Sequence, residues 1–313
     1  MFVDLRKQYR KSLKSFDTEE HIDLAFYRPL GFAWAYLFRR LGVTPNAVTV
    51  ASIFLGIGAG ICFYFNDLWI NVCGMLLLIW ANTFDSCDGQ LARMTGHYSP
   101  LGRILDGLSG DIWFVTIYAA ICLRENATSG FFGAHPWLIW AFALLTGICH
   151  AKQAAMADYY RQFHLLQVKG AEGSELDRAD DLRRRWNALP WKHNVWRKIT
   201  TWFYANYTAN QEIFSPAMQS LRAEMRRRWP DGNVPLKVRE AFRRLSRPLM
   251  KYTNILTFNW RTIALFTSLF IGQPWLYFAF EILVLNVLLA YMVRRHEGIC
   301  RAFEADLRAG IYD

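Results

Sequence analysis

Long apolar runs separated by short polar stretches dominate the pattern of this chain. Six segments are each about long enough, at about 1.5 Å rise per residue, to cross most of a hydrocarbon core about 30 Å thick. They are residues 49–65, 68–84, 104–123, 137–156, 255–272 and 275–293, and the third, fourth and fifth carry polar side chains. The pattern predicts an all-α integral membrane protein with six transmembrane helices.

Two segments depart from the membrane pattern. Residues 24–43 mix Phe, Trp, Tyr and Leu with three arginines, which predicts an amphipathic helix lying in the membrane interface. Directly after it, Thr44 can cap a helix whose first turn contains Pro45. Residues 161–251 are rich in Arg and Trp and are predicted to form a helical cytoplasmic insert.

The changes in pattern predict four parts of the chain. They are a cytoplasmic arm with the interfacial helix (1–43), transmembrane helices 1–4 (44–160), the basic insert (161–251), and transmembrane helices 5–6 with a cytoplasmic tail (252–313).

Charge predicts the orientation. The net charge is +10, and Lys and Arg crowd the N-terminal arm, the insert and the C-terminal tail, whereas the connections on the other side hold Arg124 as their basic residue. By the positive-inside rule both termini and the 93–103 loop are cytoplasmic. The charged N-terminus predicts no cleavable signal peptide, and the six scattered cysteines are expected to be packing residues.

The basic, aromatic insert has two interpretations. Basic residues interleaved with aromatics can form a nucleic-acid surface. A helical hairpin lying on anionic headgroups explains the same composition. In a protein with six spans we favour the membrane and expect no nucleic-acid partner.

Three acidic residues lie at the ends of strongly apolar segments. They are Asp85 and Asp88 in 84-FDSCDGQLAR-93, and Asp106 in 102-GRILDGLSGD-111. Burying a carboxylate without compensation costs several kcal/mol, on the order of 3. Helix capping or pairing with Arg93 and Arg103 explains any single Asp, but the full spacing favours hard divalent ions held by oxygen ligands, Mg²⁺, Mn²⁺ or Ca²⁺.

The same helix faces carry residues suited to a bound phosphate. Gly89 and Ala92 lie on the face of Asp85, which leaves the backbone open to a metal-bound phosphate, and Arg93 follows at the cytoplasmic end. On the next span Gly102 precedes Asp106 by four residues, which pairs another open position with a carboxylate.

The combined spacing D85-x-x-D88-G89-x-x-A92-R93, eight residues, G102-x-x-x-D106 resembles the signature of the CDP-alcohol phosphotransferase family. The element 44-TPNAVT-49 is similar to what such enzymes carry before their first span. The resemblance implies six core helices, an interfacial N-terminal helix, and transfer of a phosphatidyl or substituted phosphoryl group from a CDP-linked donor to an alcohol with release of CMP. The signature covers about 25 residues and leaves the insert unexplained.

The resemblance also implies roles for these residues. Two Mg²⁺ or Mn²⁺ ions on Asp85, Asp88 and Asp106 would hold the donor pyrophosphate. Arg93 would neutralise a phosphate oxygen, while Gly89, Ala92 and Gly102 would leave room for the donor. The expected partners are a CDP-linked lipid, a polar alcohol and membrane lipids, with homodimerisation left open.

One position departs from the family pattern, which ends D-x-x-x-D with the last Asp as presumed general base. Gly110 stands there, and Asp111 comes one residue late. A π-bulge within 107–110 would return Asp111 to the metal side, and we predict it as the base. His150, at the cytoplasmic end of the fourth span, is the alternative, and loss of catalysis is a third interpretation.

Cationic and amide groups suggest an acceptor site. Lys152, Arg261 and Asn259 are candidates for binding an anionic acceptor such as a polyol phosphate. Snorkelling, or an ion pair with a cluster Asp, explains Arg261 equally well. Glu281 is expected to be a packing or interfacial residue.

The family has two branches, and we predict the first, which uses CDP-diacylglycerol and a polar alcohol, with inositol or inositol phosphate favoured. The alternative is transfer of phosphocholine or phosphoethanolamine onto diacylglycerol or ceramide, which 95-TGHYSPLG-102 resembles. A transporter or scaffold is the competing class, but broken midplane helices and repeats are not evident. The expected location is a bacterial inner membrane or the endoplasmic reticulum.

Overall fold

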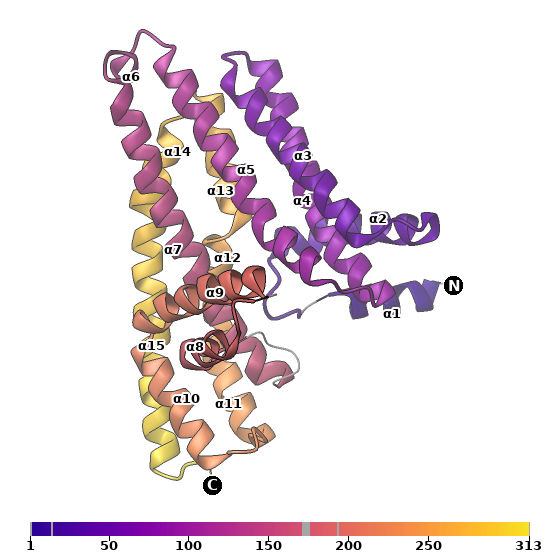
Figure 1. The fold of residues 1–313 in the computed structure, drawn as a ribbon, viewed down its shortest axis with the longest axis vertical. Helices are drawn as coiled ribbons and strands as arrows, with labels where there is room; N and C mark the ends of the chain where they lie inside the picture. Colours follow the sequence, from indigo (N-terminus) through magenta and orange to yellow (C-terminus); the bar gives the residue numbers. More distant parts are fainter. Residues whose placement is uncertain (1, 14, 171–175, 193, 313) are drawn as a thin grey trace. The chain divides into compact units, whose positions relative to one another are not determined.

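The computed structural model describes residues 2–13, 15–170, 176–192 and 194–312, and its regular elements are all helical (Figure 1). The N-terminal elements are α1 (Phe2–Ser12), the π-helical turn η1 (Asp23–Tyr27), α2 (Arg28–Leu41), α3 (Pro45–Tyr64), α4 (Leu68–Thr95), α5 (Pro100–Asn126), α6 (Phe131–Ala134) and α7 (Pro136–Lys169). The others are α8 (Ala179–Ala188), α9 (Val195–Ile213), α10 (Pro216–Arg228), α11 (Leu236–Ser246), η3 (Arg247–Leu249), α12 (Met250–Ile255), α13 (Phe258–Phe270), α14 (Leu276–Ala279), the π-helical η4 (Phe280–Leu285) and α15 (Asn286–Arg308). The predicted all-α fold is confirmed.

Five helices in the described chain are long and apolar enough to cross a membrane. They are α3, α4, residues Ile104–Asn126 of α5, α7, and the continuous run Leu276–Arg308. The remaining predicted span, 255–272, contains α13, whose 13 residues rise about 20 Å and fall short of a hydrocarbon core about 30 Å thick. The protein is therefore an all-α multi-pass membrane protein, and the count of six spans stays a prediction.

The chain forms two compact units, and each has its own internal packing. The first comprises residues 1–149 and 259–283, and the second comprises 150–258 and 284–313. Residues 171–175 and 193 of the predicted insert lie outside the described residues, while the rest of it contains the end of α7, the helices α8 to α11, η3 and the start of α12. The four predicted domain boundaries stay predictions.

Local capping signals set the helix ends that surround the acidic cluster. The Thr44 side chain accepts a hydrogen bond from the Ala47 amide at 3.4 Å, so α3 begins as predicted. Gly96, with φ of 71°, ends α4 in the left-handed conformation that glycine adopts readily. Ser99 then accepts from the Gly102 amide at 2.9 Å and begins α5. Only a short connection therefore separates two acid-bearing helices.

The N-terminal amphipathic segment is helical, as predicted, through η1 and α2. A cluster joins α2 and the start of α3 to α4; its buried members are Ala35, Val48, Cys87 and Leu91, and Trp34, Phe38 and Phe84 pack against it. A Cβ on Gly31 would lie 3.2 Å from the backbone nitrogen of Cys87, so α2 approaches the backbone of α4 closely at this glycine. The interfacial position of α2 stays a prediction.

In the second unit, α10 packs beside α15. Glu297 of α15 accepts from the Ala217 amide at 2.6 Å and the Met218 amide at 3.3 Å, which satisfies two free donors in the first turn of α10. The His296 ring stacks on Tyr160 of α7 at 3.9 Å between centroids. These contacts pack α10 against α15, and α15 against α7, within the second unit.

Candidate functional site

Three carboxylates converge where α4 ends and α5 begins. Asp85 and Asp88 stand one turn apart on α4, Asp106 stands on α5, and one oxygen from each lies within 4.8 Å of the others. Asp88 is 3% exposed. The predicted convergence of these residues is confirmed.

The donor set fits a hard divalent ion. All three side chains offer oxygen, the ligand that Mg²⁺ and Mn²⁺ prefer. Three acids held this close repel one another strongly when ionised, and bound cations relieve that repulsion. Geometry and chemistry therefore agree on a metal-binding role.

Hydroxyl groups orient two of the carboxylates, and the sequence analysis did not find them. The Thr49 hydroxyl of α3 donates to Oδ2 of Asp88, and the Ser109 hydroxyl lies 2.8 Å from Oδ1 of Asp85. Ser109 also lies 2.8 Å from the carbonyl oxygen of Asp106. Thr49 closes the quoted 44-TPNAVT-49 element and Ser109 follows Asp106 by three residues, so spacing offered a signal for both. Such supporting groups fix the direction in which a ligand carboxylate points.

Arg93 covers the open position that Gly89 provides. A Cβ at Gly89 would lie 3.4 Å from Nη1 of Arg93, and Nε of Arg93 donates to the carbonyl oxygen of Ser12. The side chain is thus anchored in its own unit beside the Asp-bearing face of α4. Ala92 lies one turn after Asp88, half-buried on the same helix. The donor-binding roles of these three residues stay predictions.

Gly102 serves a close helix approach. A Cβ there would lie 2.4 Å from Oδ1 of Asn46 on α3, so an added side chain would have to displace the Asn46 amide. Asn46 also exchanges hydrogen bonds with Ser99, at 3.1 and 3.2 Å. The open position is therefore occupied by Asn46, which ties the start of α5 to α3.

The predicted bulge in α5 is wrong. The helix is a continuous α-helix from Pro100 to Asn126, and Gly107 and Gly110 permit a bulge without requiring one. On a regular helix Asp111 points about 100° away from position 110. Asp111 is exposed and is not among the three converging acids. The π-helical turns of the described chain lie at η1 and η4.

Two predicted acceptor ligands are engaged within the first unit. Nδ2 of Asn259 donates to Oε2 of Glu20 at 2.7 Å and to Oδ1 of Asp23 at 2.9 Å. Arg261 forms a fully buried ion pair with Glu281, which lies in the π-helical η4. Glu281 also accepts from the Tyr118 hydroxyl at 3.0 Å. Arg261 therefore forms its ion pair with Glu281, a residue that the sequence analysis expected to be a packing or interfacial residue.

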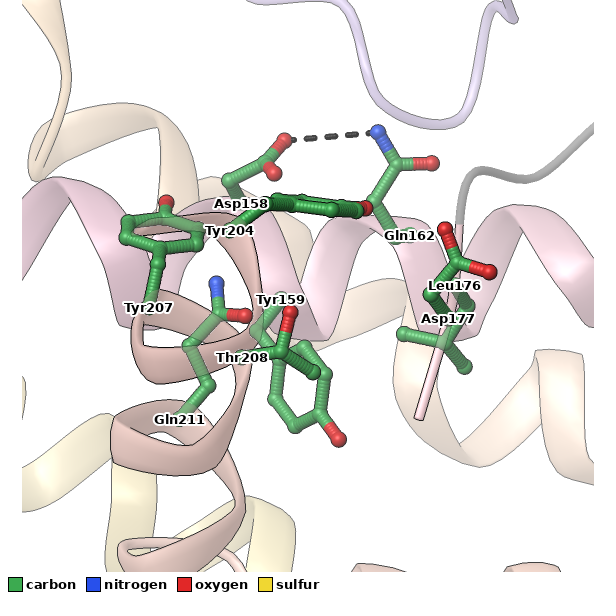
Figure 2. A pocket seen from close by; sticks show the side chains of 9 residues that line it. All are labelled: Asp158, Tyr159, Gln162, Leu176, Asp177, Tyr204, Tyr207, Thr208 and Gln211. Atoms are coloured by element: carbon green, nitrogen blue, oxygen red, sulfur yellow. Dashed lines mark hydrogen bonds between the residues drawn. The ribbon is translucent and has the colours of Figure 1, made fainter. Parts of the chain in front are cut away.

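Lys152 and His150 belong to the second unit. Nζ of Lys152 lies 3.4 Å from Oδ1 of Asn210 and 4.1 Å from the centroid of the Phe214 ring. Nearby, α7 and α9 enclose a cavity of about 90 Å³ (Figure 2). Sites for drug-sized ligands measure roughly 300–1,000 Å³, so this cavity is too small for a nucleotide. The roles of both residues stay predictions.

Comparison with known families agrees with this geometry. Residues 42–163, which hold Thr49, all three converging acids, Arg93 and Ser109, match the family model described as CDP-alcohol phosphatidyltransferase. The match lies in this segment, which is less than half of the chain. The predicted resemblance is therefore confirmed, and it covers the part of the chain in which the acids meet.

Two curated relatives match the chain over similar lengths. A CDP-diacylglycerol–glycerol-3-phosphate 3-phosphatidyltransferase of Cereibacter sphaeroides is 30% identical over 102 residues, 32% of this chain and 43% of the relative. An archaetidylinositol phosphate synthase of Aeropyrum pernix is 30% identical over 118 residues, 36% of this chain and 52% of the relative. The chain spans about half the length of these relatives. No solved structure matches significantly.

Proposed function

We propose that the protein transfers a phosphatidyl group from CDP-diacylglycerol to a polar alcohol and releases CMP. The observation that carries this proposal is the convergence of Asp85, Asp88 and Asp106 within 4.8 Å inside the segment that matches the CDP-alcohol phosphatidyltransferase family model. One relative is named as a phosphatidyltransferase that uses CDP-diacylglycerol and the other as an archaetidylinositol phosphate synthase; neither name contains choline or ethanolamine, which favours this branch over transfer of phosphocholine or phosphoethanolamine.

Asp85, Asp88 and Asp106 would hold Mg²⁺ or Mn²⁺, with two ions expected. Bound divalent ions neutralise charge on a pyrophosphate and on the leaving nucleotide. The Thr49 hydroxyl keeps Asp88 turned toward the cluster, and Ser109 does the same for Asp85. Arg93 would meet a donor phosphate oxygen, beside the space left by Gly89 and Ala92.

For the acceptor we propose a phosphorylated polyol, with inositol phosphate favoured. One relative is named for glycerol 3-phosphate and the other for an inositol phosphate lipid, so both names contain a phosphorylated polyol. Lys152, Arg261 and Asn259 are the proposed acceptor residues. Of these, Arg261 and Asn259 already bind acidic side chains of the protein. They would therefore support the acceptor site indirectly, by holding the helices around it in place.

The proposed orientation puts both termini and the insert in the cytoplasm, the side on which the acids lie. A soluble CDP-linked nucleotide headgroup and a polar acceptor are then reached from one compartment. The basic residues of the arm, insert and tail support this orientation.

A CMP-release assay on the purified full chain tests the function. CDP-diacylglycerol is offered with inositol, inositol 1-phosphate, glycerol 3-phosphate or serine, and CDP-choline or CDP-ethanolamine is offered with diacylglycerol. We expect release with CDP-diacylglycerol and a phosphorylated polyol, and loss of release in excess EDTA. Release from the CDP-aminoalcohols alone would select the other branch, and release that survives EDTA would contradict the metal role. No release with any pair would identify an inactive member of the family.

A second assay decides the proton acceptor. The regular α5 weakens the case for Asp111, which depended on a bulge, and so favours the alternative, His150. We therefore expect His150→Ala to lower turnover by about 10² to 10⁴, the usual contribution of a general base, and Asp111→Asn to leave it within a few-fold. The opposite result would restore Asp111 as the base. Equal binding of the CDP donor by both variants shows that the change lies in chemistry.

A further inference from the structure

Helix α9 buries polar residues and exposes apolar ones. Its buried residues are Lys198, Ala205, Thr208 and Gln211. Its exposed side follows the helical repeat through Trp196 (66% exposed), Ile199 (36%), Phe203 (62%) and Tyr207 (43%). Further exposed apolar side chains on or beside the helix are Trp191, Val195, Trp202, Tyr204, Ile213 and Phe214. A helix on a water-facing surface has the reverse arrangement.

Specific contacts hold the polar side of α9 inward. Nζ of Lys198 donates to the carbonyl oxygen of Leu189 at 2.7 Å and lies 4.9 Å and 5.0 Å from the ring centroids of Trp186 and Trp191. Nε2 of Gln211 donates to the carbonyl oxygen of Ala155 on α7 at 2.8 Å. Turning the aromatic side inward would break these bonds, so they hold the rings in the outward direction.

The positions at which α9 contacts α7 indicate how deep α9 lies in the membrane. Within α7, whose residues are all described, the large exposed apolar side chains run from Trp137 to Ile148 and then stop. The C-terminal end of α9 meets α7 directly after that point, at Lys152 and Ala155. Four residues of helix rise about 6 Å, which is the distance from hydrocarbon to the headgroup layer in order of magnitude.

The direction of α9 agrees with that depth. In Figure 1 α9 runs across α7 and does not run along it. Figure 2 shows Tyr204 and Tyr207 of α9 beside Asp158 and Gln162 of α7, on the flank where the small cavity forms. A helix that crosses a spanning helix at the edge of its apolar surface lies in the plane of the membrane.

We infer that the aromatic face of α9, defined by Trp196, Ile199, Trp202 and Phe203, docks into the lipid interface of the bilayer. Trp and Tyr favour this layer because their rings are apolar and their N–H and O–H groups reach water. The exposed Lys192 and Arg197 beside the face supply the cations that anionic headgroups attract. This inference concerns the membrane and does not depend on the proposed transfer activity.

Site-directed labelling tests the docked face. Trp196→Cys and Phe203→Cys place a thiol on the face, and Arg183→Cys places one on the exposed side of α8, the helix that precedes α9. Each variant of the full chain is reconstituted in phosphatidylcholine–phosphatidylglycerol vesicles and treated with a charged maleimide during freeze–thaw, so that both leaflets are reached. Modification is read by mass spectrometry for each peptide, which separates the new thiol from the six native cysteines.

We expect positions 196 and 203 to react at least about tenfold more slowly than position 183, and to react readily with a lipid-soluble maleimide. The ratio should not change when the protein is diluted in excess lipid. Equal rates at 203 and 183 would show that the face lies in water. Protection that disappears on dilution would show that a second copy covers it, and slow reaction at all three positions would show that no single face is selected. Each of these three results overturns the inference.

Discussion

Asp88 and Glu281 are both buried carboxylates within one unit, on helices that span the membrane, and different groups accompany them. Glu281 has a buried arginine, Arg261, and a tyrosine hydroxyl as partners. Asp88 has the Thr49 hydroxyl and, within reach of one ion, two further acids. The charge of Glu281 is neutralised by an arginine of the protein itself. Asp88 instead adds to a cluster of negative charge, which becomes favourable when a cation binds. The comparison separates an acid used for structure from an acid used for binding.

The strongest test of this difference is Asp88→Asn. The change removes a proposed metal ligand, and we expect CMP release to fall by about 10³ or more, with loss of the rise in unfolding temperature that we expect Mg²⁺ or Mn²⁺ to give the parent protein. Without metal the variant should be at least as stable as the parent, because repulsion from Asp85 and Asp106 is relieved. Thermal unfolding with and without metal, beside the activity assay, measures both. A variant that keeps its metal response would remove Asp88 from the site.

Glu281→Gln addresses the other acid. It leaves the buried Arg261 without its carboxylate, which typically costs about 3–5 kcal/mol of unfolding free energy. The midpoint of thermal unfolding should fall clearly, while the added stability from Mg²⁺ should remain. The double variant Arg261→Met, Glu281→Leu provides the control, since removing both charges should recover most of the loss. If Glu281→Gln abolished acceptor use without a loss of stability, the pair would belong to the binding site.

The smallest expected effect is that of Thr49→Val. The isosteric change removes the hydroxyl that donates to Asp88 and should weaken Mn²⁺ binding by about 10- to 100-fold, the usual contribution of a group that orients a metal ligand. Mn²⁺ titration followed by electron paramagnetic resonance gives the affinity. Thr49→Ser keeps a hydroxyl and should stay near the parent value, so equal weakening in both variants would point to packing.

The sequence predicted the spans and the acid cluster because both depend on short-range spacing. Asp85 and Asp88 must share a helix face, and Asp106 must lie near them when only a short turn separates two antiparallel spans. The partnership of Arg261 with Glu281 joins residues 20 apart on different helices, so no local pattern reveals it. The prediction of a bulge in α5 was wrong for another reason: glycine permits a π turn but does not require one. Periodicity in α9 likewise shows an apolar side without saying whether that side faces the core.

The tie between Asn46 and Ser99 has a consequence for biosynthesis. These residues bond the beginning of the first span to the beginning of the third across 53 positions of chain. A ribosome must therefore deliver three successive helices to the bilayer before the tie can close and Asp106 can join the other two acids. Until that moment Asp85 and Asp88 sit in a newly inserted helix with an incomplete set of ligands. Capture of the proposed metal would thus be a late event in maturation, and we expect cells starved of divalent ions to accumulate a fully inserted chain whose acidic centre is more sensitive to proteases than that of the finished protein.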